Sequence, residues 1–341
     1  MSEFDLIARY FTREPTRAAL GVGDDCALLD QERGMQMAIS SDMLVEGRHF
    51  FPDVDPAALG HKALAVNLSD LAACGATPRA FTLALALPHV DEAWLQQFSA
   101  GLWALSDAHG CELIGGDTTR GPLNICITVF GDVPRGQALL RSGAQAGDDI
   151  YVSGNLGDAR LALEMLQGKL QLPPQLHPEV LAEARIRLER PIPRVALGQA
   201  LRGVATAAID ISDGFVGDLG HILKASGVGA TIHTHLATKL IACSSRFDWT
   251  QTIFDAEKQL RFALAGGDDY ELAFTAPPHA HQTVLAAAVR SQTPVTLVGR
   301  VETRPGLRLV DADHQSVKRR FSSFDHFGDF GTSKNAADLH E

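Results

Sequence analysis

The sequence lacks the patterns that place a chain in several common classes of protein. Its five cysteines never form a C-x-x-C pair, and their odd number does not suggest a disulfide framework. No apolar run approaches the ~20 residues of a membrane span. The first residues lack the basic start and apolar core of a signal peptide. We therefore expect a cytoplasmic protein with no membrane partner and no zinc site.

Clustered positive charge is also absent. The chain has 30 Lys and Arg against 41 Asp and Glu, a formal net charge of -11, and no basic run. Nucleic-acid binding without sequence preference depends on clustered Lys and Arg, so we expect no nucleic-acid partner. The excess of carboxylates leaves two interpretations: it keeps the protein in solution, or some of the carboxylates hold cations.

Familiar catalytic and nucleotide-binding motifs are missing as well. The sequence contains no G-x-x-x-x-G-K-[ST], no G-x-G-x-x-G after a strand, no protein-kinase catalytic loop, no H-E-x-x-H and no G-x-S-x-G. An ATP site in this chain would have to be built from other parts.

Helix and strand patterns do occur, and they alternate along the whole chain, which predicts an α/β (α+β) protein. A length of 341 residues with 45% hydrophobic residues is enough for two cores. The glycine-rich segment 136–147 is typical of a linker. We expect an N-terminal domain at 1–138, a C-terminal domain at 147–330 and a flexible polar tail at 331–341.

Turn and capping signals predict the elements near the candidate site. A strand over 35–41 should end at Ser41-Asp42. An N-cap and proline at Asp55-Pro56 should begin a helix that ends near Gly75. A strand over 205–209 should run into Asp210.

Aspartates supply the main candidate chemistry. Loops at strand ends are where α/β proteins place their sites, and magnesium prefers oxygen ligands completed by substrate phosphates. Taken singly, each aspartate is more often a cap or turn residue. As a set they predict a metal–phosphate site. The aspartates at or just beyond the end of an apolar segment are Asp25, Asp42, Asp117, Asp210 and Asp213.

Each of the other candidate residues has an ordinary structural interpretation as well as a functional one. Asp70 lies in the apolar helix LAVNLSDLAA, with Asn67 on the same face, and a buried charge there is costly unless it is paired or bound to metal. Residues 115–120 could bring N–H groups to a phosphate or form an ordinary turn. Arg141 could pair with phosphate or stay solvated. His49 could touch a phosphate or lie at the surface.

The order of these motifs is similar to that of one known family. The chain resembles the thiamine-monophosphate kinases, which belong to the superfamily of aminoimidazole ribonucleotide synthetase-like ATP-binding proteins, over residues 4–328. DMLVEGRHF and the closing residues 324–327 point to the thiamine-specific member. The matching segments, in order, are GVGDDCALL, SSDMLVEGRHF, KALAVNLSDLAACGA, ELIGGDTTRG, RSGA, IDISDGFVGDLGHI and GGDDYEL.

The resemblance implies a fold and an activity. Two α/β domains are expected, with the N-terminal sheets of two chains pairing in a homodimer. The implied enzyme is a thiamine-phosphate kinase that transfers the ATP γ-phosphate directly to thiamine monophosphate, giving thiamine diphosphate and ADP, with several Mg2+ ions. No covalent aspartyl-phosphate or dedicated base is expected, because the attacking phosphate oxygen is already ionised.

The resemblance also assigns residues to roles. Asp42, Asp117, Asp210 and Asp213 are expected to be catalytic. The implied metal ligands are Asp25, Ser41, Asp42, Asp70, Asp117, Asp210 and Asp213. The implied ATP contacts are Trp103, Gly116, Asp117, Arg141 and Ser212. The implied contacts to thiamine monophosphate are His49, Asp268 and Phe324.

Two of these positions depart from the family pattern. Asp268 stands where the family usually has Glu, and Phe324 stands where it often has Tyr or Trp. A phenyl ring can still stack on a cationic thiazolium ring, although it has no hydroxyl to donate. Both departures concern the acceptor site and leave the proposed metal ligands unchanged.

Three kinds of alternative are considered: another enzyme of the superfamily, a non-catalytic binding protein and an α/β protein whose aspartates are all caps. Another ATP-using enzyme of the superfamily, such as an amidine-forming ligase, would share the metal ligands. A selenophosphate synthetase would need a reactive Cys and Lys in a glycine-rich N-terminal segment, which is not found. A non-catalytic nucleotide- or metal-binding protein would not need so many aspartates, and an α/β protein with capping aspartates alone would not show the ordered motifs.

Overall fold

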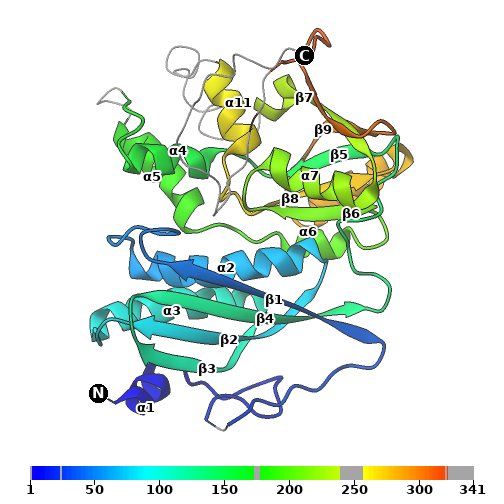
Figure 1. Ribbon diagram of the computed structural model, residues 1–341. Helices are drawn as coiled ribbons and strands as arrows, with labels where there is room; N and C mark the ends of the chain where they lie inside the picture. The colour runs from blue at the N-terminus through cyan, green and yellow to red at the C-terminus, as the bar shows by residue number, and fades with distance from the viewer. Residues whose placement is uncertain (1, 24, 173–176, 239–255, 319–320, 322–341) are drawn as a thin grey trace, which may run out of the picture.

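The computed structural model describes residues 2–23, 25–172, 177–238, 256–318 and 321. These residues form two β-sheets with helices packed on their faces (Figure 1). The N-terminal part contains α1 (Glu3–Leu6), the π-helical turn η1 (Ile7–Phe11), β1 (Met35–Val45), α2 (Pro56–Ala73), β2 (Thr77–Leu87), α3 (Glu92–His109), β3 (Glu112–Arg120) and β4 (Asn124–Pro134).

The remaining elements follow the glycine-rich segment. They are β5 (Asp149–Ser153), α4 (Asp158–Leu166), α5 (His177–Glu189), α6 (Val195–Ala200), β6 (Ala207–Ile211), α7 (Phe215–Ser226), β7 (Gly229–His233), α8 (Thr234–Ala237), α11 (Ala256–Ala265), β8 (Glu271–Ala276), the 3-10 turn η3 (Pro278–Ala280), α12 (His281–Arg290), β9 (Val295–Glu302) and β10 (Gly306–Val310). None of the described helices is both long and apolar enough to cross a bilayer.

The first sheet has the strand order β1-β4-β2-β3. β4 pairs antiparallel with β1 and β2, and β2 pairs parallel with β3. One face of this sheet packs on α2, which in turn packs on α3. On the other face, Ile39 and Met43 of β1 remain 60% and 53% exposed, so part of this face is uncovered in the single chain.

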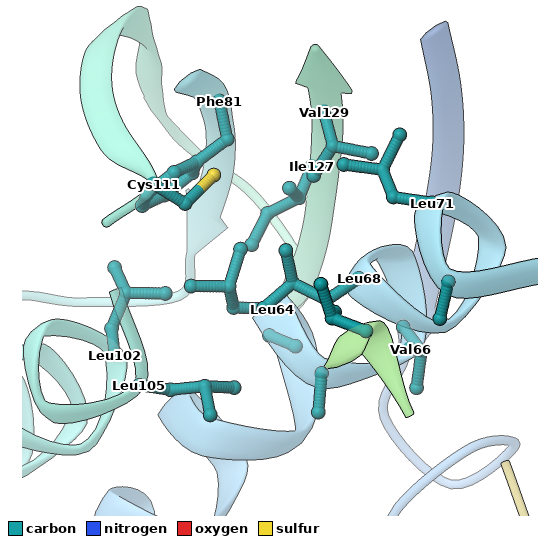
Figure 2. Close-up of a cluster of buried hydrophobic side chains, with 14 of the residues drawn as sticks. Leu64, Val66, Leu68, Leu71, Phe81, Leu102, Leu105, Cys111, Ile127 and Val129 are labelled. Carbon is teal, nitrogen blue, oxygen red and sulfur yellow. The ribbon is translucent and has the colours of Figure 1, made fainter. Parts of the chain in front are cut away.

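Helix α2 lies at the centre of the molecule, between the two sheets (Figure 1). Asp55 caps its first turn by accepting the N–H of Ala58, and Pro56 occupies the first turn, where no intrahelical N–H bond is lost. Leu64 lies between Leu102 of α3 and Ile127 of β4 (Figure 2). A helix that is apolar on nearly all sides is buried on all sides, which explains why α2 contacts both sheets.

The second sheet has the strand order β10-β7-β9-β5-β8-β6. Phe215 and Leu219 of α7 belong to the core on one of its faces. Tyr151 of β5 and Phe274 of β8 belong instead to the core that contains α2. One continuous hydrophobic core therefore joins the first sheet, α2 and the second sheet, and it fixes the relative position of the residues between them.

The α/β class with two sheets agrees with the sequence-based prediction, and several boundaries do not. β1 continues to Val45, so Asp42 lies inside a strand paired with Ile127. Gly116 and Asp117 lie inside β3 and not in a loop after it. Backbone pairing with neighbouring strands extends these segments beyond the local turn signals. The strands β7 and β10, bounded by glycine, were not predicted. Pairing of the first sheet across a dimer stays a prediction, and the tail 331–341 lies outside the described residues.

Candidate functional site

A cavity of about 550 Å³ lies where the two parts of the molecule meet. Most of the residues singled out from the sequence line it, although they come from segments spread over more than 200 positions. The lining side chains relevant to the chemistry are Asp42, His49, Lys62, Asp70, Arg141, Asp210, Ser212, Asp213, Asp268 and Tyr270.

Strand β1 and helix α2 are joined at the floor of this cavity by two hydrogen bonds. Asn67 of α2 accepts the N–H of Asp42 at 3.0 Å. Ser40 of β1 donates to Oδ2 of Asp70 at 2.5 Å. Because Asn67 and Asp70 are three positions apart on one helix face, the NLSD sequence holds both carboxylates at the same end of α2.

Asp210 enters from the other sheet. It lies on β6, buried, and accepts a hydrogen bond from Ser69 of α2 at 2.8 Å. Ser69 is itself fully buried. Adjacent residues of α2 therefore face different domains, with Asp70 toward β1 and Ser69 toward β6, which brings the three carboxylates of Asp42, Asp70 and Asp210 toward one region.

The electrostatics of this region favour a cation. Burial, with the charges of Asp70 and Asp213, raises the pKa of Asp42 to about 6. Burial also raises the pKa of Asp70, against the opposing hydrogen bond from Ser40. Burial and the charge of Asp70 raise the pKa of Asp210 well above its ordinary value. The anionic form of each carboxylate is thus disfavoured relative to an exposed aspartate, and a bound cation would favour it.

The loop before α7 is shaped by Asp218, which the sequence reasoning did not single out. Oδ2 of Asp218 accepts the backbone N–H groups of Ser212, Asp213 and Gly214, each at 3.1 Å. Burial and the charge of Asp213 raise the pKa of Asp218 to about 7, whereas these hydrogen bonds act in the opposite direction. Asp218 therefore holds the ISDG turn in the shape that presents Ser212 and Asp213 to the cavity.

The described residues contain no group of three or more His, Cys, Asp or Glu side chains close enough to hold one metal ion by themselves. The carboxylates that line the cavity are close enough to change one another's pKa values, as Asp70 does for Asp42 and Asp210, without forming such a group. Magnesium commonly takes one or two protein carboxylates and completes its shell with phosphate oxygens and water. This donor set fits ions shared with a phosphate-bearing ligand better than it fits a structural metal.

Several predicted residues are not brought to this cavity in the single chain. Ser41 points to the opposite face of β1, where its hydroxyl contacts Thr128 at 2.9 Å. Asp117 lines a separate cavity beside the uncovered face of the first sheet. Trp103 is buried against the N-terminal segment, donating to the carbonyl of Tyr10. Asp25 is exposed in a loop, and Phe324 lies outside the described residues. Their assignments stay predictions.

Sequence reasoning also missed residues that the structure places in the site. Lys62 and Tyr270 line the cavity. Ser69 donates a hydrogen bond to Asp210 of β6, and Asp218 accepts the N–H of Ser212 in the loop before α7. Lys62 had a recognisable signal, a charge in an otherwise apolar helix, which is the same signal that identified Asp70. The others follow ordinary turn or strand patterns, and only their tertiary contacts distinguish them.

Another cavity, of about 570 Å³, lies at the start of β1. Three arginines line it, but each has protein partners: Arg79 pairs with Glu32 and Asp132, Arg17 donates to a backbone carbonyl, and Arg202 does the same. Its guanidinium groups are therefore engaged within the protein, and the cavity between the two sheets is the better candidate site.

Two family matches cover most of the chain. Residues 23–133 match the family described as "AIR synthase related protein, N-terminal domain", and residues 145–312 match "AIR synthase related protein, C-terminal domain". The fold and the carboxylate-lined cavity thus define a two-domain AIR synthase related protein.

Individual relatives narrow this class. A thiamine-monophosphate kinase of Salmonella typhimurium is 47% identical over 329 residues, covering 95% of this chain and 98% of that protein. The crystal structure of a thiamine-monophosphate kinase from Stenotrophomonas maltophilia has a TM-score of 0.79 at 43% identity, covering 92% of this chain and 96% of that one. The chain belongs to the thiamine-monophosphate kinase family.

A further solved structure bears on the ligands of the family. It is described as AaThiL complexed with AMPPCP and TMP, and it has a TM-score of 0.71 at 28% identity, covering 87% of this chain and 89% of that one.

Proposed function

We propose that this protein transfers the γ-phosphoryl group of ATP directly to thiamine monophosphate, giving thiamine diphosphate and ADP. The observation that carries this proposal is the similarity to thiamine-monophosphate kinases at 47% identity over 95% of the chain. The related structure with AMPPCP, an ATP analogue, and TMP supports the pair of substrates. The cavity supplies what phosphoryl transfer needs, which is positioning and charge neutralisation more than covalent chemistry.

Magnesium is part of the proposal. Asp42, Asp70, Asp210 and Asp213 are the chain's candidate ligands at the cavity, and burial raises the pKa of each of the first three. Bound Mg2+ would neutralise the phosphate oxygens of both substrates and the charge that develops during transfer. The oxygen-only donor set and the absence of a ready three-carboxylate group among the described residues both support ions held jointly with phosphate.

The chain's own side chains are proposed to bind and orient the two substrates. Of the proposed ATP contacts, Arg141 and Ser212 line the cavity, and of the proposed acceptor contacts, His49 and Asp268 line it. The backbone N–H of Val45 donates to Nδ1 of His49 at 2.9 Å, which places the proton of the neutral ring on Nε2. The attacking phosphate oxygen is already ionised at neutral pH, so no side chain has to remove a proton.

A homodimer is proposed to complete the ATP side of the site. Asp117, which follows Gly116 in β3, lines a separate cavity beside the uncovered face of the first sheet. A second copy packed on that face would bury Ile39 and Met43, which are more than half exposed in one chain. The assignments of Asp25, Ser41, Trp103 and Phe324 rest on the family resemblance.

The direct test is a reaction with ATP, magnesium and thiamine monophosphate. We expect thiamine diphosphate and ADP in equal amounts, and no product when magnesium is chelated. Chromatographic separation of the thiamine esters provides the measurement. Failure to form thiamine diphosphate while a different acceptor is phosphorylated would overturn the proposed substrate.

Asp213→Ala tests the metal assignment. Removing one candidate metal ligand should lower kcat about 100-fold or more, the size of effect seen when one preorganised charge-stabilising group is lost. Asp107→Asn is the matched control, because Asp107 lies on the surface of α3 in an exposed pair with Arg13. Near-normal turnover of a folded Asp213→Ala protein would remove Asp213 from the metal ligands.

A further inference from the structure

Lys62 and Asp268 form an ion pair across the boundary between the two halves of the molecule. Nζ of Lys62, on α2, lies 2.9 Å from Oδ1 of Asp268, 206 positions further along the chain. Both residues line the cavity that contains Asp42. The pair is therefore part of the wall of the candidate site, with one charge from each half.

The two members of the pair differ in exposure. The side chain of Lys62 is 4% exposed, whereas that of Asp268 is 35% exposed. A buried ammonium group is destabilising unless it has an anionic partner. Lys62 therefore requires an anion at this position, and Asp268 has one side from which a ligand can reach it.

Asp268 does not depend on Lys62 for its position. Its φ is +59° and its N–H donates to the carbonyl of Ser212 at 2.8 Å. Tyr270 has a φ of +50°, and its N–H donates to the carbonyl of Ile211 at 2.8 Å. Positive φ is uncommon outside glycine and persists where the surroundings hold it. Because the end of β6 fixes this turn, the backbone of Asp268 stays in place when Lys62 changes partner.

We propose that the Lys62–Asp268 pair selects an acceptor that carries both a cationic ring and a phosphate. This inference rests on the proposed function and adds a residue and a selection mechanism to it. When the acceptor enters, its cationic ring takes the place of Lys62 beside Asp268, and its phosphate takes the place of Asp268 beside Lys62. One ion pair is exchanged for two, and neither protein charge is left unpaired.

Selection follows from the ligands that cannot complete this exchange. A cation without a phosphate displaces Lys62 from Asp268 and leaves a buried ammonium group unpaired. A phosphate ester without a cation leaves Asp268 unpaired. An unpaired charge disfavours the wrong ligand, and the effect is larger for the buried Lys62 than for the partly exposed Asp268. The pair therefore disfavours a ligand that carries only one of the two charges more strongly than two independent contacts would.

Lys62→Met tests this exchange, because methionine keeps an unbranched apolar side chain of similar length and removes the charged ammonium group. Affinities of the full-length protein for thiamine monophosphate and for thiamine are measured by titration calorimetry. We expect the affinity for thiamine monophosphate to fall about tenfold or more, as for a lost charged hydrogen bond. The affinity for thiamine should stay equal or rise, since the ring no longer displaces a lysine. In turnover, KM for thiamine monophosphate should rise with KM for ATP unchanged.

Three further variants keep the result decisive. Asp268→Asn should instead weaken thiamine binding. Lys224→Met, at an exposed position of α7 away from the cavity, should change neither affinity. Lys62→Gln is read in the same way if Lys62→Met does not fold. Equal weakening of both ligands by the Lys62 variants, or no change in either, would make the pair a structural bridge and overturn the inference.

The same experiments separate this inference from the proposed function. If the unmodified protein forms no thiamine diphosphate, the proposed reaction is wrong. The affinities for thiamine and for thiamine monophosphate still test whether the ion pair is exchanged. If turnover is normal and the Lys62 variants keep the same preference for thiamine monophosphate over thiamine, only the exchange is wrong.

Discussion

Asp42 combines burial with two acidic neighbours, and this has a consequence for stability. Its pKa is raised to about 6 from an ordinary 3.8 by burial and by the charges of Asp70 and Asp213. The folded state therefore holds a proton more tightly than the unfolded chain does. The contribution of Asp42 to stability is full below about pH 4 and is lost as the pH rises through about 6.

Asp42→Asn should for this reason stabilise the metal-free protein, and more so at pH 8 than at pH 5. At pH 8 the parent carries an ionised, partly buried carboxylate that the neutral amide lacks, whereas at pH 5 the parent's Asp42 is mostly protonated. Thermal unfolding in the presence of a chelator at the two pH values gives the measurement. A stabilisation of equal size at both values would mean that the acidic cluster does not set the pKa of Asp42.

At pH 8, saturating Mg2+ should make the parent more stable than Asp42→Asn. An ion bound beside Asp42 stabilises the folded parent by mass action, and the amide variant loses part of that gain because it offers a weaker ligand. We expect a larger rise in the unfolding temperature on adding Mg2+ for the parent than for Asp42→Asn, and equal rises would count against Asp42 as a ligand.

At the scale of elements, the packing of α2 on α3 fixes the position of the residues that α2 contributes to the site. The two helices approach closely at Gly60 and Gly101: a Cβ at Gly60 would lie 2.0 Å from the carbonyl oxygen of Phe98, and one at Gly101 would lie 1.9 Å from that of Ala57. These contacts are with backbone, which cannot rotate away. Since α2 also carries Lys62 and Asp70, a shift of the helix axis would move both charges.

Gly60→Ala should consequently lower the free energy of unfolding, by about 1–3 kcal/mol as for other overpacked sites, and should reduce activity by displacing α2. Urea unfolding provides the measurement. Gly220→Ala is the matched control, because a Cβ at this helical glycine of α7 meets nothing within 4 Å. There we expect stabilisation of up to about 1 kcal/mol from helix propensity alone. A neutral Gly60→Ala would show that the crossing can relax.

At the scale of the whole molecule, the uncovered face of the first sheet predicts association. Ile39→Asp places a charge at a position that is 60% exposed in one chain and would be buried in the proposed dimer. We expect a shift toward monomer in light scattering coupled to gel filtration, together with loss of turnover because Gly116 and Asp117 no longer meet a second copy.

Val289→Asp is the control for that experiment. Val289 on α12 is 79% exposed, so a charge there should leave the association state and the activity unchanged. If Ile39→Asp stays fully associated, the face is not the interface. If the unmodified protein is a monomer with full turnover, one chain suffices for the reaction.

Local signals in the amino-acid sequence are enough to predict some parts of this protein. The cap at Asp55 and the proline at position 56 lie where the sequence predicts them. These signals depend on side chains within one turn of their own backbone, so they can be identified without knowledge of the fold. The aspartate motifs likewise indicate the family, because their order is a property of the sequence alone.

Which of those residues meet is decided by tertiary packing. Ser41 and Asp42 are neighbours in sequence, yet they lie on opposite faces of β1, because strand side chains alternate. Lys62 meets Asp268 only because a continuous core packs α2 against the second sheet. Side-chain direction in a strand depends on its register, and contacts between distant segments depend on the packing of whole elements. Neither can therefore be predicted from the local sequence.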